Sequence, residues 1–142
     1  MKPDTRCYAA RVDNLDAVTR FVGTCADRFG LDDGTRFRLL LALEEAFVNV
    51  CRYAYPEGTG TAEVTCESDG GAFALAIADR GRPFDVLSLP EPDTRADVVL
   101  RPVGGLGVHF IRTCASSASY RRDDGRNILR MVFRPAESGD QP

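Results

Sequence analysis

The chain has 142 residues, of which 44% are hydrophobic, so it can bury one core but is too short for two ordinary domains. Its net charge is −3 and its basic residues are scattered, which argues against nucleic acid as a partner. No apolar run approaches the roughly 20 residues of a membrane-spanning helix, and the N-terminus lacks the apolar part of a signal peptide, so we expect no membrane association and a cytoplasmic location.

The first part of the chain predicts one strand followed by two helices. We expect a strand over residues 5–12 and then a helix that Asn14 can cap, because apolar residues recur there at helical spacing until Gly30. The Leu-Asp-Asp-Gly-Thr segment can start a second helix, which runs to about Tyr53 and ends before the next proline.

A β-hairpin and a long loop are expected next. Polar and apolar residues alternate over 61–67 and again over 73–77, on either side of an Asp-Gly-Gly turn. Residues 86–103 contain three prolines and a charged middle, which predicts a mobile loop with too few apolar residues to hold it in the core.

The C-terminal part predicts a helix over 106–113, strands over 116–122 and 127–134, and a disordered tail over 135–142. Helices that alternate with two consecutive hairpins favour an α+β fold. We expect a two-layer α/β sandwich, in which helices cover one face of a mostly antiparallel sheet. One domain over residues 1–134 follows.

The five cysteines are widely spaced and include no Cys-x-x-Cys pair, which argues against a disulfide framework and against a zinc site. We therefore expect reduced thiols in the core at Cys7, Cys25, Cys51, Cys66 and Cys114.

The second helix, Leu-Ala-Leu-Glu-Glu-Ala-Phe-Val-Asn-Val-Cys-Arg-Tyr, places Glu45, Asn49 and Arg52 on one face beside an apolar stripe. The amide oxygen of Asn49 is a hard ligand of the kind that suits Mg²⁺, which takes its other ligands from water and phosphate. Glu45 lies one turn earlier, where its carboxylate can take up a proton from an attacking hydroxyl. A solvated polar stripe is the alternative for this helix considered alone.

A second motif, Ile-Ala-Asp-Arg-Gly-Arg-Pro-Phe-Asp, places Asp79 at the end of an apolar strand. A buried carboxylate needs a partner, and the N6 amino group of adenine can be that partner. Gly81 lets the backbone approach a base without a Cβ in the way. The alternative is a turn in which Asp79 accepts a hydrogen bond from its own backbone.

The third motif places Gly104, Gly105, Leu106 and Gly107 directly before the apolar positions of a new helix. Free backbone N–H groups at a helix N-terminus favour phosphate. A plain loop is the alternative. The phosphate-binding interpretation therefore depends on the order of this motif and its distance from the other two motifs. His109 is the only histidine and cannot form a triad or a metal cluster alone.

In order and spacing, these three motifs resemble the N, G1 and G2 boxes of the GHKL (Bergerat) ATPases, and in detail the RsbW-type anti-sigma-factor serine/threonine kinases. The resemblance covers about residues 5–134 and implies the Bergerat ATP-binding fold, with ATP and Mg²⁺ as cofactors. It implies that Glu45, and not Glu44, is the general base. It also places Arg52 and Tyr53 near the phosphates.

The resemblance further assigns Asp79 to adenine, and Phe84 completes the Asp-x-Gly-x-x-Phe-Asp form seen in RsbW-like proteins. Two positions depart from the pattern. Tyr53 replaces a histidine common among the anti-sigma kinases. Asn127 lies near a position where many superfamily members carry threonine, and we assign it no nucleotide contact.

The resemblance implies a homodimeric anti-sigma factor that binds a sigma factor and phosphorylates a Ser or Thr of a STAS-type antagonist. Residues 86–103 would then close over ATP as a lid. A nucleotide-dependent regulatory binding module without kinase activity is the alternative. An ATP hydrolase or ligase-like member is disfavoured because those proteins carry further domains. The presence of both Glu45 and Asn49 favours the kinase.

Overall fold

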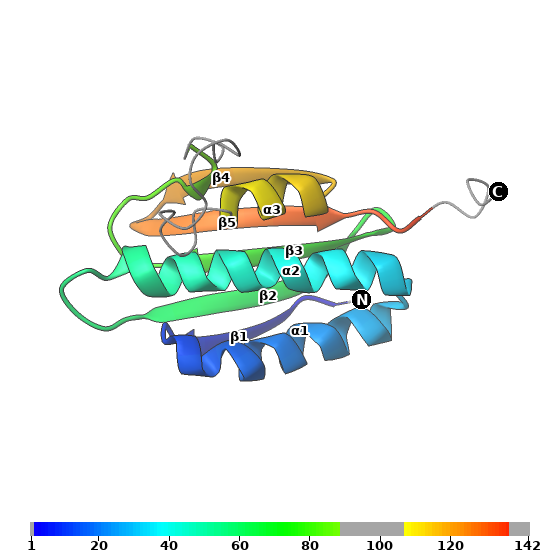
Figure 1. Cartoon of the computed structure of the whole chain (residues 1–142), viewed down its shortest axis with the longest axis horizontal. Coiled ribbons are helices and arrows are strands. Elements are labelled where there is room, and N and C mark those ends of the chain that lie inside the picture. Colours follow the sequence, from blue (N-terminus) through cyan, green and yellow to red (C-terminus); the bar gives the residue numbers. More distant parts are fainter. Residues whose placement is uncertain (1, 89–106, 137–142) are drawn as a thin grey trace, which may run out of the picture.

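The structure is a computed structural model that describes residues 2–88 and 107–136. In these residues, five strands form an antiparallel sheet in the order β1-β2-β3-β5-β4. The strands are β1 (Asp4–Ala9), β2 (Thr61–Asp69), β3 (Ala72–Asp79), β4 (Ser117–Asp123) and β5 (Arg126–Phe133). Figure 1 shows the helices α1 (Leu15–Phe29), α2 (Asp33–Asn49) and α3 (Gly107–Cys114) on one side of this sheet. The expected two-layer α+β fold is therefore confirmed.

The alternation of side chains along the strands separates a face that packs on the helices from an open face. The packed face contributes every second residue of three strands to the core: Ala62, Val64, Cys66, Phe73, Leu75, Ile77, Leu129, Met131 and Phe133. On the open face, Arg130 reaches across β3 to Glu67 and Asp69, with N–O distances of 3.7 and 2.9 Å. The period-two pattern of the sequence thus predicts which side of β2 is buried, whereas β3 and β5 have buried residues on both sides.

The helix ends follow the signals in the sequence, with one exception. Gly30 ends α1 in the left-handed conformation, with φ of 88°, and Asp32 caps α2 through its side chain. Asn14 stands at the start of α1 but does not cap it, because its amide donates to the backbone oxygen of Ala9 at 2.9 Å. The second helix continues beyond α2 as a short π-helical segment, Val50–Ala54.

Three expectations need correction or lie outside the described residues. The first strand ends at Ala9, and a short 3₁₀ turn, Val12–Asn14, follows it. The segment expected to lack core contacts begins with another 3₁₀ turn, Val86–Ser88, in which Val86 is buried. Residues 89–106 and 137–142, which include most of the predicted lid and of the tail, lie outside the described residues.

The cysteine prediction holds for three of the five positions. Cys25, Cys66 and Cys114 are buried, Cys51 is half-buried and Cys7 is exposed on the edge strand β1, and all five are free thiols. Burial raises the pKa of Cys51 to about 11, so this thiol stays protonated at neutral pH. Among the described helices, none has the length and apolar character needed to cross a bilayer.

The cap of α2 generates a first prediction. The backbone N–H and the hydroxyl of Thr35 donate to Asp32 at 3.0 and 2.8 Å, and these hydrogen bonds hold the pKa of Asp32 below its usual value. A carboxylate whose pKa falls on folding stabilises the fold above its unfolded pKa, and this contribution is lost as the pH drops through the folded pKa. Asp32→Ala should lower the free energy of unfolding by about 1 kcal/mol at neutral pH.

Urea unfolding at neutral and at strongly acidic pH measures this effect, and the difference from wild type should shrink in acid. Asp33→Ala removes an exposed carboxylate from the first turn of the same helix and should cost less. Equal losses in the two variants at neutral pH would show that the cap contributes nothing specific.

Candidate functional site

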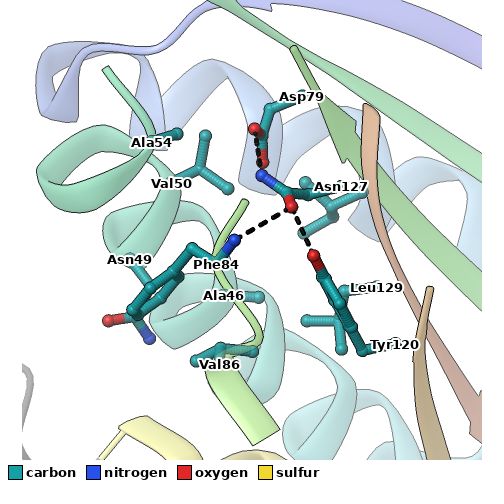
Figure 2. Close-up of a pocket in the computed structure, with 11 residues that line it drawn as sticks. Ala46, Asn49, Val50, Ala54, Asp79, Phe84, Val86, Tyr120, Asn127 and Leu129 are labelled. Atoms are coloured by element: carbon teal, nitrogen blue, oxygen red, sulfur yellow. Dashed lines mark hydrogen bonds between the residues drawn. The ribbon is translucent and has the colours of Figure 1, made fainter. Parts of the chain in front are cut away.

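A pocket opens where the C-terminal end of the second helix meets the ends of β3 and β5 (Figure 2). Its walls are mostly apolar, with a few polar groups that converge on it, which is the usual composition of a small-molecule site. The lining residues are Ala46, Asn49, Val50, Ala54, Ile77, Asp79, Phe84, Val86, Tyr120, Asn127 and Leu129. Three residues predicted from the sequence, Asn49, Asp79 and Phe84, therefore come together here.

Asp79 is the last residue of β3, and its side chain is buried within this pocket. Its Oδ1 accepts hydrogen bonds from the backbone N–H of Gly81 and from the side-chain amide of Asn127, both at 2.9 Å. The turn proposed as the alternative for Asp79 is thus present, and it coexists with a place in the pocket. Because both bonds from described residues go to Oδ1, the other carboxylate oxygen is available to a ligand.

Asn127, to which the sequence assigns no nucleotide contact, also lines this pocket. It faces Asp79 in the β3–β5 register and is buried. Tyr120, a pocket residue that the sequence motifs do not indicate, donates its hydroxyl to Asn127 Oδ1 at 2.5 Å, as Figure 2 shows. The alternation in β5 contained a usable signal, because Asn127 has the same parity as the core residues Leu129 and Met131 and therefore points to the packed face.

Asn49, the last residue of α2, carries the least satisfied polar group of this site. Its side chain is only 3% exposed, and among the described residues neither its amide nitrogen nor its amide oxygen has a hydrogen-bond partner. Leaving a buried polar group without a partner costs about 1–3 kcal/mol. Such a group is expected where a ligand completes the site. The π-helical segment that follows Asn49 is itself a feature common at functional sites.

Glu45 lies one turn before Asn49 and is half-buried, whereas Glu44 is exposed. Burial raises the pKa of Glu45, the neighbouring charge of Glu44 raises it further, and Arg52 opposes the shift. The helix therefore brings Glu45 and Arg52 within electrostatic reach of each other, as their spacing predicts. A carboxylate with a raised pKa is better suited to accept a proton near neutral pH.

Two further predicted residues have surroundings that the sequence did not reveal. The ring of Tyr53 packs on that of Phe84, with ring centroids 5.3 Å apart. Gly81 is buried against the end of the π-helical segment, where an added Cβ would lie 2.1 Å from the backbone oxygen of Ala54. The absence of a side chain at Gly81 thus permits contact between two backbones. The expectation that it also lets the backbone approach a base stays a prediction.

The glycine-rich motif is only partly described. Gly107 is the first residue of α3, so a helix does begin where the sequence predicts one. Gly104, Gly105 and Leu106 lie outside the described residues, and so does the side chain of His109. Their predicted contact with phosphate remains a prediction.

Residues 8–133 match the histidine kinase-like ATPase domain family. The chain belongs to this family. The serine/threonine-protein kinase BtrW of Bordetella bronchiseptica is 29% identical over 102 residues, covering 71% of this chain and 72% of that protein. The serine-protein kinase RsbW of Bacillus thuringiensis is 23% identical over 128 residues, covering 87% of this chain and 80% of that protein. The sequence is thus that of a kinase-like ATPase with relatives named as serine/threonine kinases.

The histidine kinase-like fold is also seen in a solved structure of the RsbU and RsbW domains of Rv1364c from Mycobacterium tuberculosis. The two folds match with a TM-score of 0.67 at 15% identity, over 95% of this chain and 33% of that chain. The chain therefore spans about a third of that longer polypeptide. The predicted RsbW-type fold is confirmed.

The close approach at Gly81 generates a second prediction. Gly81→Ala places a Cβ against the backbone of Ala54, which cannot move aside as a flexible side chain would. We expect a loss of about 1–3 kcal/mol in the free energy of unfolding, as for other overpacked sites. Gly58→Ala is the matched control, because open space surrounds Gly58. Thermal or urea unfolding of both variants measures the difference, and a fully stable Gly81→Ala would refute the packing role.

Proposed function

We propose that this protein is an ATP-binding anti-sigma factor with protein serine/threonine kinase activity, which phosphorylates a STAS-type antagonist in a partner-switching pathway. The observation that carries the proposal is the buried amide of Asn49, which has no hydrogen-bond partner in residues 2–88 and 107–136 and lines a pocket whose other end is Asp79. The names of the relatives support the kinase class. Resemblance to anti-sigma kinases supports the sigma factor as partner and a cytoplasmic homodimer.

The adenine ring of ATP fits the chemistry of the pocket around Asp79. The available carboxylate oxygen of Asp79 can accept a hydrogen bond from the N6 amino group, and the apolar walls can cover the ring faces. Phe84 and Val50 supply part of these walls. Selectivity for a 6-aminopurine follows, because a carbonyl at the same position would face a carboxylate.

Asn49 fits the metal end of the nucleotide. Its amide oxygen would be a ligand of Mg²⁺, whose other ligands are phosphate oxygens and waters, and the unsatisfied amide of this structure is consistent with that role. When bound, the metal supplies charge neutralisation at the phosphates. Arg52 is exposed beyond Asn49 and can meet the same phosphates.

Glu45 distinguishes a kinase from a binding module that only senses nucleotide. Its carboxylate lies one helical turn from Asn49, so it can take up the proton of an acceptor hydroxyl while the phosphoryl group transfers. The presence of Glu45 together with Asn49 on one helix therefore favours the enzyme.

Nucleotide binding is the first test of the proposed function. We expect Mg²⁺-dependent binding of ATP and ADP by isothermal titration calorimetry. Asp79→Asn should weaken binding by about tenfold or more, because hydrogen bonds to charged groups are the stronger ones. Asp69→Asn is the control, since that carboxylate pairs with Arg130 on the open face of the sheet. No binding of either nucleotide at millimolar concentrations would overturn the proposal.

Phosphotransfer to a STAS-domain protein is the second test, and it should separate the two helix residues. Glu45→Ala should bind ATP normally but transfer phosphate roughly 10²-fold or more slowly. Asn49→Ala should lose metal-dependent affinity and activity together, and Glu44→Ala should resemble wild type. Full activity of Glu45→Ala towards a verified substrate would exclude Glu45 as general base.

The general-base role of Glu45 also predicts that the phosphotransfer rate depends on pH. A general base acts when deprotonated, and the pKa of Glu45 is raised by burial, so the rate should fall as the pH drops through that raised pKa. The decline should therefore begin at a higher pH than for an ordinary glutamate. Steady-state rates across the acid range measure it, with the nucleotide affinity followed in parallel. A rate that stays constant down to the usual range of glutamate would contradict the assignment.

A further inference from the structure

The side-chain amide of Asn127 connects three segments of the chain at the base of the pocket. Its Nδ2 donates to Asp79 Oδ1 at 2.9 Å and to the backbone oxygen of Arg82 at 2.8 Å. Its Oδ1 accepts from the backbone N–H of Phe84 at 3.1 Å and from the hydroxyl of Tyr120 at 2.5 Å. A further, longer bond of 3.2 Å comes from Arg122.

These contacts fix the orientation of the amide. A rotated Asn127 side chain would turn its N–H groups towards donors and its oxygen towards the carboxylate of Asp79 and the carbonyl of Arg82. Tyr120 and Arg122, both on β4, thus hold the oxygen in place. Because both hydrogens of Nδ2 are engaged, Asn127 has none to offer a base and can affect it only through its neighbours.

The first neighbour is Asp79, whose Oδ1 is held between Asn127 and the backbone N–H of Gly81. With Oδ1 occupied by two donors, the carboxylate cannot rotate freely. Its second oxygen is then directed by the network and not by the ligand. A carboxylate fixed in this way loses less conformational freedom when it accepts a hydrogen bond from a base.

The second neighbour is the segment that leads from Asp79 to Phe84. Asn127 binds this segment at Arg82 and at Phe84, and Arg122 donates to the backbone oxygen of Gly81 at 2.8 Å. The ring of Phe84, which lines the pocket, is therefore positioned from β5 and β4. One amide fixes both the acceptor for the base and part of the wall beside it.

We propose that Asn127 is a positioning residue that determines selectivity for the 6-amino group of adenine, acting through Asp79 and supported by Tyr120. The inference rests on the proposed function, because it assumes that this pocket receives the adenine of ATP. It adds a role that the sequence analysis did not assign to Asn127. It also predicts that the contribution of Asn127 depends on the ligand carrying a 6-amino group.

A comparison of two nucleotides tests this dependence. Purine riboside 5′-triphosphate differs from ATP by lacking the 6-amino group, so it cannot donate to Asp79. Calorimetry with Mg²⁺ should show that the wild-type protein prefers ATP by about tenfold to a hundredfold, as expected for a hydrogen bond to a charged group. In Asn127→Ala this preference should fall below about threefold, mostly because the affinity for ATP is lower.

Asn14→Ala is the matched control, because Asn14 also donates its amide to a backbone oxygen but lies at the start of α1. It should retain the full preference for ATP. Tyr120→Phe removes one donor to the amide and should reduce the preference by about two- to fivefold, the effect of one modest hydrogen bond. If thermal unfolding shows that Asn127→Ala is not folded, the two nucleotides are compared on Tyr120→Phe instead.

The outcomes separate the inference from the proposed function. Wild-type protein that binds neither nucleotide refutes the proposed function itself. Wild-type protein that binds both equally shows that Asp79 does not recognise the 6-amino group, which overturns the inference. If Asn127 had a purely structural role, Asn127→Ala would weaken the binding of both nucleotides by the same factor. That result also overturns the inference. If only Tyr120→Phe is folded, an unchanged preference of this variant for ATP overturns it as well.

Discussion

The hydrogen bond between Asp79 and Asn127 is the constraint on which the rest of the site depends. A carboxylate at the end of a buried strand must be paired, because an isolated charge in an apolar environment is costly. Asn127 supplies the donor from the neighbouring strand β5. That requirement fixes the amide, the amide fixes the segment up to Phe84, and this segment forms part of the pocket wall.

The two ends of the pocket differ in how their polar groups are satisfied. At one end, the amide of Asn127 has partners for all of its donor and acceptor atoms. At the other, the equally buried amide of Asn49 has none among the described residues. A ligand in this pocket would therefore meet a preorganised acceptor at Asp79 and complete an unsatisfied group at Asn49. For the proposed nucleotide, the site would be rigid at the base and open at the phosphates.

Local patterns in the sequence predicted the elements but not the contacts between them. The alternation in β2 and β3 and the stop at Gly30 required only neighbouring residues, so these features could be read directly. The pairing of Asp79 with Asn127 joins residues 48 positions apart and depends on the strand register. The same limit explains Gly81, whose close approach to Ala54 follows from tertiary packing and not from its own motif.

The distance between the two ends of the pocket is set by backbone contact and not by the ligand. Ala54 closes the π-helical segment, and its carbonyl accepts a hydrogen bond from the backbone N–H of Arg82 at 2.9 Å. Gly81 permits this approach because it has no side chain. The helix that carries Asn49 is thereby joined to the strand end that carries Asp79. Since the base and the phosphates of one nucleotide can be only a limited distance apart, the proposed binding of a single nucleotide to both residues depends on this junction.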